Sequence, residues 1–371
     1  MSSQPDQPTT ASRRRAALKY ARSEHRIDAM LVTRPVDVSY LSGFGGEDSF
    51  LLFDDDRAAL ITDARFSEAA ETECPGLDVV TRAGAITKAV AAALKGRNVR
   101  RLGIQSDHVT LKLREALQSA LGKRKLVPLA DVVRKGRLVK DDGERRATRK
   151  AVRAAQTAFR ELVDRGAAGF VGQTEMAVAA ELDALMRRHG ATASSFPTIV
   201  ASGPGSSIPH YRPTRRTIRR GEAVLIDWGA VVDAYCSDLT RVVFVDTIPP
   251  ALKDVYEVVR QAQRAGIDAI RSGVHCKTVD RAAREVIAEA GYAERFTHGL
   301  GHGIGRDIHE GPVLATSCVM PLRSGMIVTV EPGIYLPGVG GIRIEDDVLV
   351  TADGHRRLTS LPRSIDSMVL Q

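Results

Sequence analysis

The stretch Gly221-Glu-Ala-Val-Leu-Ile-Asp227-Trp-Gly229 aligns without a gap on Gly325-Met-Ile-Val-Thr-Val-Glu331-Pro-Gly333. Each copy is a short apolar run, typical of a buried strand, that begins after a glycine and ends in a carboxylate before a second glycine. An internal match of this kind indicates that the C-terminal two-thirds of the chain contains the same structural unit twice.

The sequence around each copy repeats as well. A second strand-like run with its own acid follows each copy, and this acid is Asp238 in the first case and Glu345 in the second. Two stretches with helical spacing of apolar residues precede each copy, at 144–166 and 174–190 and again at 249–272 and 276–291. We therefore predict an α/β (α+β) fold whose C-terminal part holds two helix-helix-hairpin halves related by a pseudo-twofold axis.

The rest of the chain predicts a second domain. Helical and strand-like runs alternate before residue 136 and indicate a smaller α/β domain, and the charged segment that follows lacks apolar periodicity. We predict a disordered N-terminus at 1–12, the N-terminal domain at 13–136, a linker at 137–144 and a C-terminal domain at 145–371.

The composition indicates the cellular location of the protein and excludes some classes of binding partner. The 371 residues include no apolar run long enough to span a membrane, and the polar N-terminus lacks the apolar core of a signal peptide. The four cysteines have neither metal-like nor paired spacing, which is typical of reduced thiols. The net charge of +8 is spread over mixed-sign segments. We therefore expect a cytoplasmic protein that binds neither membrane nor nucleic acid.

The four acids are expected to converge. A hairpin that turns near residues 232 and 233 would place Asp227 opposite Asp238, and a hairpin around Gly338 would place Glu331 opposite Glu345. Opposed strand positions have Cβ atoms about 4.5 to 5.5 Å apart, so the carboxylates would meet at the seam between the two hairpins. Buried like charges at that distance need cations to compensate them.

A histidine would complete a ligand set for two divalent ions. His302 lies between two glycines, which allow backbone and ligand to approach closely, and is the natural candidate. Mainly oxygen donors with one nitrogen suit manganese, cobalt or zinc, and are too oxygen-rich for a structural zinc site. His298 and His309 share the same segment, and His210 lies in a proline-bounded loop. Each of these three could also be an ordinary hydrogen-bonded histidine.

These residues resemble the pita-bread metallopeptidase family, which contains methionine aminopeptidases, prolidases and aminopeptidase P. The ligand order Asp, Asp, His, Glu, Glu of that family matches Asp227, Asp238, His302, Glu331 and Glu345. The accompanying motifs are Pro209-His210, Gly301-His-Gly-Ile-Gly305, His309-Glu310, Glu331-Pro-Gly333 and Arg343-Ile-Glu345. The N-terminal part is similar to the creatinase-type N-terminal domain through Tyr40-Leu-Ser-Gly-Phe44.

The resemblance implies roles for individual residues. Asp238 and Glu345 would bridge two divalent ions, manganese first with cobalt or zinc as alternatives, while Asp227 chelates one ion and His302 with Glu331 completes the other. The catalytic residues would be His210, His309 and Glu331. The substrate-binding residues would be His298, Arg343 and Tyr211, although a packing role for Tyr211 is equally open.

The extra N-terminal domain favours the proline-specific branch of the family. The main expectation is therefore an aminopeptidase that hydrolyses the Xaa-Pro bond at peptide N-termini through a metal-bridging hydroxide, on peptides with proline at position two. A prolidase that hydrolyses Xaa-Pro dipeptides is the alternative. A small-molecule amidinohydrolase or ring-opening hydrolase, or a silent binding module on the same fold, are further alternatives. The resemblance also implies a homodimer, in which Asp37 could supply an acid to the partner's site.

Overall fold

The computed structural model describes residues 9–371 and divides into two compact units, one that ends at Arg137 and one that runs from Leu138 to Gln371. Each unit has its own hydrophobic core. None of the helices in this described range is long and apolar enough to cross a membrane.

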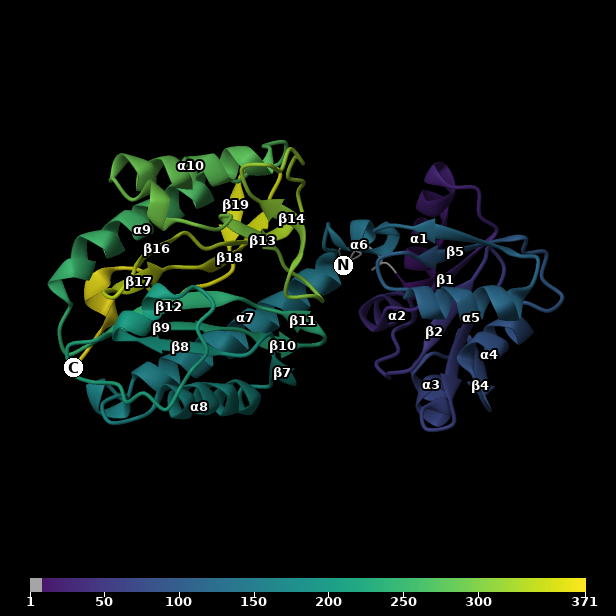
Figure 1. Cartoon of the computed structure of the whole chain (residues 1–371), viewed down its shortest axis with the longest axis horizontal. Helices are drawn as coiled ribbons and strands as arrows, with labels where there is room; N and C mark the ends of the chain where they lie inside the picture. The colour runs from purple at the N-terminus through teal and green to yellow at the C-terminus, as the bar shows by residue number, and fades with distance from the viewer. Residues whose placement is uncertain (1–8) are drawn as a thin grey trace, which may run out of the picture. The chain divides into compact units, whose positions relative to one another are not determined.

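The N-terminal unit is built on one six-stranded sheet with the strand order β4-β3-β2-β1-β5-β6 (Figure 1). Two antiparallel pairs join β1, β2 and β3, whereas β1–β5, β5–β6 and β3–β4 are parallel. Its elements are α1 (Thr10–Glu24), β1 (Ala29–Val32), α2 (Pro35–Ser42), β2 (Phe50–Phe53), β3 (Ala58–Asp63), α3 (Ser67–Glu73), β4 (Asp78–Arg82), α4 (Ile86–Ala93), β5 (Arg101–Gln105), α5 (Leu111–Leu121), β6 (Lys125–Leu129) and α6 (Val132–Arg137).

Two boundaries differ from those predicted. The disorder expected at 1–12 is wrong for its last three residues, because α1 begins at Thr10 and the Thr9 hydroxyl caps it by accepting from Ser12 N; residues 1–8 lie outside the described range. The linker expected at 137–144 is shorter, because Arg137 belongs to α6 and α7 begins at Asp142. A capping box between Asp141 and Glu144 fixes that start.

The C-terminal unit places helices on the two outer sides of its strands (Figure 1). The elements of its first half are α7 (Asp142–Val163), η1 (Ala167–Gly169), α8 (Glu175–Arg188), β7 (Ala193–Ser194), β8 (Ile199–Ser202), η2 (Gly203–Ser207), β9 (Ala223–Trp228), β10 (Ala230–Val232), β11 (Tyr235–Cys236) and β12 (Leu239–Val245). Those of its second half are α9 (Pro250–Asp268), α10 (Cys276–Glu289), η3 (Ala293–Arg295), β13 (Gly301–Gly303), β14 (Glu310–Leu314), β15 (Ile327–Val330), β16 (Gly333–Leu336), β17 (Gly340–Arg343), β18 (Asp346–Val350), β19 (His355–Arg357), η4 (Ile365–Met368) and β20 (Val369–Leu370).

The predicted duplication is confirmed by the strand order. The first half pairs β8 with β9 and β9 with β12, and the second half pairs β13 with β15 and β15 with β18. All four pairings are antiparallel. Each half therefore presents two helices followed by three antiparallel strands, and the repeated stretch of sequence forms the middle one of the three.

The register of the first hairpin differs from the one predicted. Its tight turn lies at Asp233 and Ala234, both with positive φ, and Asp227 pairs with Thr240 rather than with Asp238. The turn is centred one residue later than expected, which shifts the pairing by two positions. A shift of two returns each side chain to the same face of the sheet, so Asp227 and Asp238 remain on one face as diagonal neighbours.

The second hairpin opens where its two acids lie. Val330 pairs with Asp346 in one ladder and Gly333 pairs with Arg343 in the next, so Glu331 and Glu345 fall between the two ladders in the same register. The backbone of Glu345 instead bridges to Thr240 of the first half, and Glu345 N donates to Thr240 O at 3.1 Å. This bridge joins the two halves at the position of the acids.

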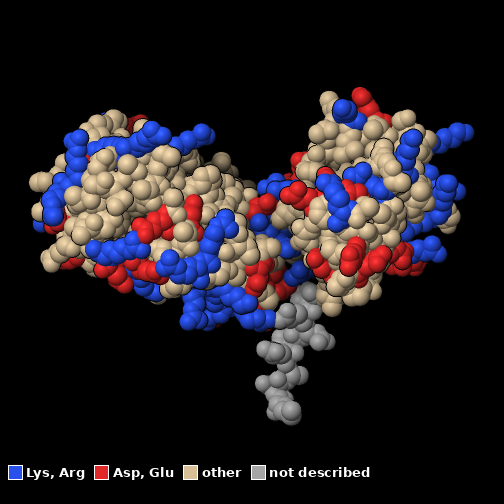
Figure 2. Space-filling view, turned by 90° about the horizontal axis from the view of Figure 1, so that it is seen from below, with Lys and Arg blue, Asp and Glu red and all other residues tan. Residues whose placement is uncertain are grey.

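Basic and acidic side chains are mixed over most of the visible face of each unit (Figure 2). On α7, for example, the basic residues share the helix with Asp142, Glu144 and Glu161. This distribution agrees with the mixed-sign segments of the sequence.

Replacing Ala234 with glycine tests the hairpin turn. Ala234 has a φ of 64° and is exposed, and this left-handed conformation costs a non-glycine residue roughly 1 kcal/mol. We expect Ala234→Gly to raise the midpoint of thermal unfolding by about 2 to 4 °C in differential scanning calorimetry. The exposed helical residue Ala180 is the control, because Ala180→Gly should lower the midpoint. A lower midpoint for Ala234→Gly would contradict the turn.

Candidate metal centre

The four acids lie at the ends of the central strands of the C-terminal unit. Asp227 is the last but one residue of β9, Asp238 immediately precedes β12, Glu331 directly follows β15 and Glu345 directly precedes β18. The backbone hydrogen bonds between neighbouring strands fix the strand ends, and they therefore also fix the positions of these side chains. The strands of both halves thus carry their acids to one place.

His302 joins these acids from β13. Its Nε2 lies 3.5 Å from Asp238 Oδ2 and 3.4 Å from Glu331 Oε1. One ligand atom each from Asp238, His302 and Glu345 lie within 4.8 Å of one another, which is the geometry of a group that can hold a metal ion. Four of the five candidate ligands are therefore in direct proximity.

The glycines beside His302 are needed for its placement. A Cβ at Gly301 would lie 2.1 Å from Thr329 O, and a Cβ at Gly303 would lie 1.9 Å from Gly311 O. Only glycine permits these approaches, as the sequence indicated. The tight backbone packing holds the imidazole at the acids.

The tautomer of His302 leaves the lone pair of Nε2 available to a metal. Nδ1 lies 3.0 Å from Gly303 O, and a carbonyl can only accept, so Nδ1 carries the proton. The Nε2 lone pair then faces the oxygens of Asp238 and Glu331. Three acceptors that face one another repel unless a cation lies between them.

The electrostatics of the buried acids also call for cations. Burial, followed by the charges of Asp227 and Glu331, raises the pKa of Asp238 well above its usual range. Burial, followed by the charge of Asp238, does the same for the pKa of Glu345. Ionised carboxylates at these positions destabilise the metal-free fold, and bound cations would reverse that effect.

Three buried carboxylate oxygens lack any hydrogen-bond partner among residues 9–371, namely Asp227 Oδ1, Glu345 Oε1 and Asp347 Oδ1. Buried carboxylate oxygens are normally satisfied, so unpaired ones at a cluster of acids are suited to binding cations. The donor set of four carboxylates and one imidazole fits two divalent ions.

Arg343 forms an ion pair with Asp227. Its Nη2 donates to Asp227 Oδ2 at 2.6 Å, while Oδ1 has no hydrogen-bond partner among the described residues. Each carboxylate oxygen has two lone pairs, so Oδ2 can accept from Arg343 and still bind a metal, and the chelating role of Asp227 stays a prediction.

A chain of hydrogen bonds runs from Arg343 to His298. Arg343 Nη1 donates to the hydroxyl of Tyr335 at 2.9 Å, and this hydroxyl lies 3.0 Å from His298 Nε2. His298 Nδ1 lies 2.8 Å from Gly299 O and carries the proton. Both nitrogens of His298 are thus engaged, and burial lowers the pKa of its imidazole. Neither nitrogen of His298 is therefore free to bind a metal in this arrangement.

His309 and His210 lie at the same centre. The ring of His309 packs edge-on against that of His302, with centroids 4.4 Å apart. Burial, and then the neighbouring His302, lowers the pKa of His309. His210 is exposed, and Arg343 Nη1 donates to the carbonyl of the preceding Pro209 at 3.3 Å. Glu310, next to His309, is not a ligand because it forms a buried ion pair with Lys140.

Two candidates lie elsewhere. The hydroxyl of Tyr211 donates to Glu175 Oε2 at 2.9 Å, so the structure does not bring this hydroxyl to the metal ligands. The expectation that Asp37 supplies an acid to a partner's site is wrong. Asp37 is fully buried in the N-terminal unit, where Arg137 and Gln105 bind its two oxygens at 2.7 Å each.

Sequence reasoning missed four residues that support the ligands. Thr240 donates to Glu345 Oε2 at 2.7 Å, Thr329 donates to Glu331 Oε1 at 3.2 Å, and Asp347 Oδ2 accepts from Asp238 N at 3.1 Å. Tyr335 is the fourth, as the link between Arg343 and His298. Only the alternation of the strands could have indicated the two threonines, which lie two residues from an acid.

Comparisons with known proteins show the family of the chain. Residues 146–352 match metallopeptidase family M24, and residues 14–139 match the creatinase/prolidase N-terminal domain. The chain belongs to metallopeptidase family M24 and is a metallopeptidase with the pita-bread fold. The fold and the family predicted from the sequence are confirmed.

Individual relatives span nearly the whole chain. The structure of an Xaa-Pro dipeptidase from Bacillus anthracis is 37% identical, with a TM-score of 0.91, and covers 97% of this chain and 99% of its own. An Xaa-Pro dipeptidase from Pyrococcus horikoshii is 34% identical over 92% of this chain and 95% of its own length. The structure of an X-Pro aminopeptidase from Thermotoga maritima is 36% identical, with a TM-score of 0.88, over 94% of this chain and 99% of its own.

Replacing Asp238 with asparagine tests the compensation of charge by metal. The substitution keeps the shape of the side chain and removes a carboxylate whose burial raises its pKa. We expect metal-free Asp238→Asn to unfold at the same temperature as the metal-free parent or higher, and to lose both the stabilisation by Mn²⁺ and the activity. At one hundred times its Kd, a ligand stabilises the parent by about 2.7 kcal/mol.

The raised pKa of Asp238 also predicts how the stability of the metal-free protein depends on pH. A carboxyl whose pKa is higher in the folded state than in the unfolded state contributes stability at low pH, and this contribution is lost as the pH rises. The unfolding midpoint of the metal-free parent should therefore fall more steeply with rising pH than that of Asp238→Asn. Equal slopes in scanning calorimetry would argue against the buried acid cluster.

Proposed function

We propose that the chain is an Xaa-Pro dipeptidase (prolidase) that works with two divalent metal ions. The observation that carries this proposal is the set of facing acceptors His302 Nε2, Asp238 Oδ2 and Glu331 Oε1. The relatives favour this alternative over the aminopeptidase that was the main expectation, since two of them are dipeptidases. The aminopeptidase remains the second candidate because of the Thermotoga maritima structure.

Asp238 and Glu345 would hold both ions, Asp227 Oδ1 one of them, and His302 and Glu331 the other. When bound, the ions would lower the pKa of a water and polarise the scissile carbonyl. The choice of manganese, the homodimer and the cytoplasmic location stay predictions.

Glu331 is the residue best placed to move the proton. Its side chain is partly exposed, at 19%, and its Oε1 accepts from Thr329. A carboxylate that is held in place and still open to solvent can take a proton from water and return it to the leaving amine.

His309 and His210 would bind the substrate carbonyl as it gains charge. Because burial lowers the pKa of His309, the imidazole is neutral at pH 7 and donates through its N–H. Donors that are already oriented stabilise a developing oxyanion without reorganisation. His298 and Arg343, held by Tyr335, would form the wall against the proline ring, which has no N–H and a fixed φ.

The dipeptidase proposal is tested with three peptides. We expect manganese-loaded protein to hydrolyse Ala-Pro rapidly, Ala-Pro-Phe far more slowly and Ala-Ala hardly at all, measured by release of free alanine. Faster cleavage of Ala-Pro-Phe would make the protein an aminopeptidase. Equal rates on Ala-Ala would remove the specificity for proline. No hydrolysis despite stoichiometric metal would point to another hydrolase on this fold, and no retained metal to a binding module.

Replacing His309 with asparagine tests the oxyanion role. We expect kcat for Ala-Pro to fall about 10²- to 10³-fold, which is typical for the loss of one such donor, while the metal content stays unchanged by elemental analysis. His189 provides a control, because it pairs with Glu161 on the surface and His189→Asn should leave kcat unchanged. Loss of metal from His309→Asn would instead make His309 a ligand.

A further inference from the structure

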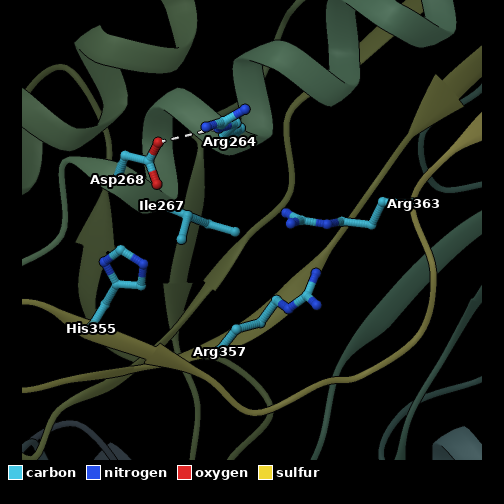
Figure 3. A pocket seen from close by; sticks show the side chains of 6 residues that line it. All are labelled: Arg264, Ile267, Asp268, His355, Arg357 and Arg363. Carbon is cyan, nitrogen blue, oxygen red and sulfur yellow. Dashed lines mark ion pairs between the residues drawn. The ribbon is translucent and has the colours of Figure 1, made fainter.

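A cavity of about 300 Å³ in the C-terminal unit lies outside the metal centre (Figure 3). None of the candidate metal ligands lines it. The lining side chains come from α9, β19 and the segment that follows β19, and they are Arg264, Ile267, Asp268, His355, Arg357 and Arg363. Figure 3 shows the side chains of Arg264, Arg357 and Arg363 entering from three different sides.

Positive charge exceeds negative charge around this cavity. Asp346, a fully buried carboxylate behind the lining, lies 3.6 Å from Arg357 Nη1 and 3.9 Å from Arg363 Nη1. Its oxygens are already occupied by the buried Arg241 at 2.7 Å, by Gln263 at 2.8 Å and by the hydroxyl of Thr359. The region therefore contains two carboxylates, Asp346 and Asp268, and four arginines, namely Arg241, Arg264, Arg357 and Arg363.

The arginines have hydrogen-bonding capacity to spare. Arg357 Nη1 is buried and makes no hydrogen bond with any residue in the described range. Burial lowers the pKa of Arg363. The positive charge of Arg357 lowers it further, whereas the negative charge of Asp346 raises it. Arg264 pairs with Asp268 at 3.5 Å, but both side chains are mostly exposed, so this ion pair is weak. A bound anion would supply negative charge and hydrogen-bond acceptors to all three arginines.

We propose that this cavity binds a compact oxyanion of the phosphate class. The planar guanidinium group donates two parallel hydrogen bonds to phosphate oxygens, and arginines that converge from several sides are the usual means of binding this group. The cavity volume is at the small end of ligand sites, which suits a phosphate or a small phosphate ester rather than a peptide.

The test is calorimetric titration of the metal-loaded full-length protein with inorganic phosphate at constant ionic strength in a chloride buffer. We expect saturable binding of one phosphate per chain, with Kd raised about tenfold by Arg264→Gln and by Arg363→Gln, since each removes one charge-assisted interaction. Sulfate should compete with phosphate.

Arg281 provides a matched control, because it forms a similar exposed pair with Glu285 at 3.6 Å on α10, and Arg281→Gln should leave Kd unchanged. Arg264 is on the surface of a helix, so its replacement does not endanger the fold. Phosphate bound at the metal centre would show the same Kd in Arg264→Gln and Arg363→Gln as in the parent. That result, or the absence of saturable binding, would overturn the proposal.

Discussion

The structure of the C-terminal unit depends on the burial of like charges. Asp227, Asp238, Glu331 and Glu345 lie at the ends of apolar strands, and three of them have carboxyl groups whose pKa is raised chiefly by burial. Among the described residues, two of their oxygens, Asp227 Oδ1 and Glu345 Oε1, have no hydrogen-bond partner. Arg343 donates a hydrogen bond to Asp227 and acts on Asp238 through its charge. The surrounding core, the glycines beside His302 and the supporting threonines keep this costly cluster in place.

The two halves meet through Thr240. Its backbone bridges to Glu345, its hydroxyl donates to Glu345 Oε2, and it pairs across the hairpin with Asp227. One residue of the first half thus positions acids from both halves. Arg241 strengthens the seam, because it is fully buried and donates to Glu345 O and to Asp346.

Much of this arrangement could be predicted from the sequence, because a strand that alternates its side chains carries its acids to one face whatever the exact turn. The turn at Asp233 and Ala234 was misplaced by one residue, since neither is the glycine that marks such turns. The tertiary contacts were not predictable in this way. Tyr335 and Arg343 meet only in the folded chain, and Asp37 reads as an exposed acid until Arg137 and Gln105 enclose it.

The seam at Thr240 also bears on the origin of the unit. Each half supplies two acids, and only the second supplies the histidine, so one half alone could not assemble the centre. A single ancestral half could have gathered four acids only by associating with a copy of itself. Fusion of the two copies would then have freed them to diverge, and the histidine on β13 and the arginine on β17 are differences that a symmetric pair could not have confined to one side.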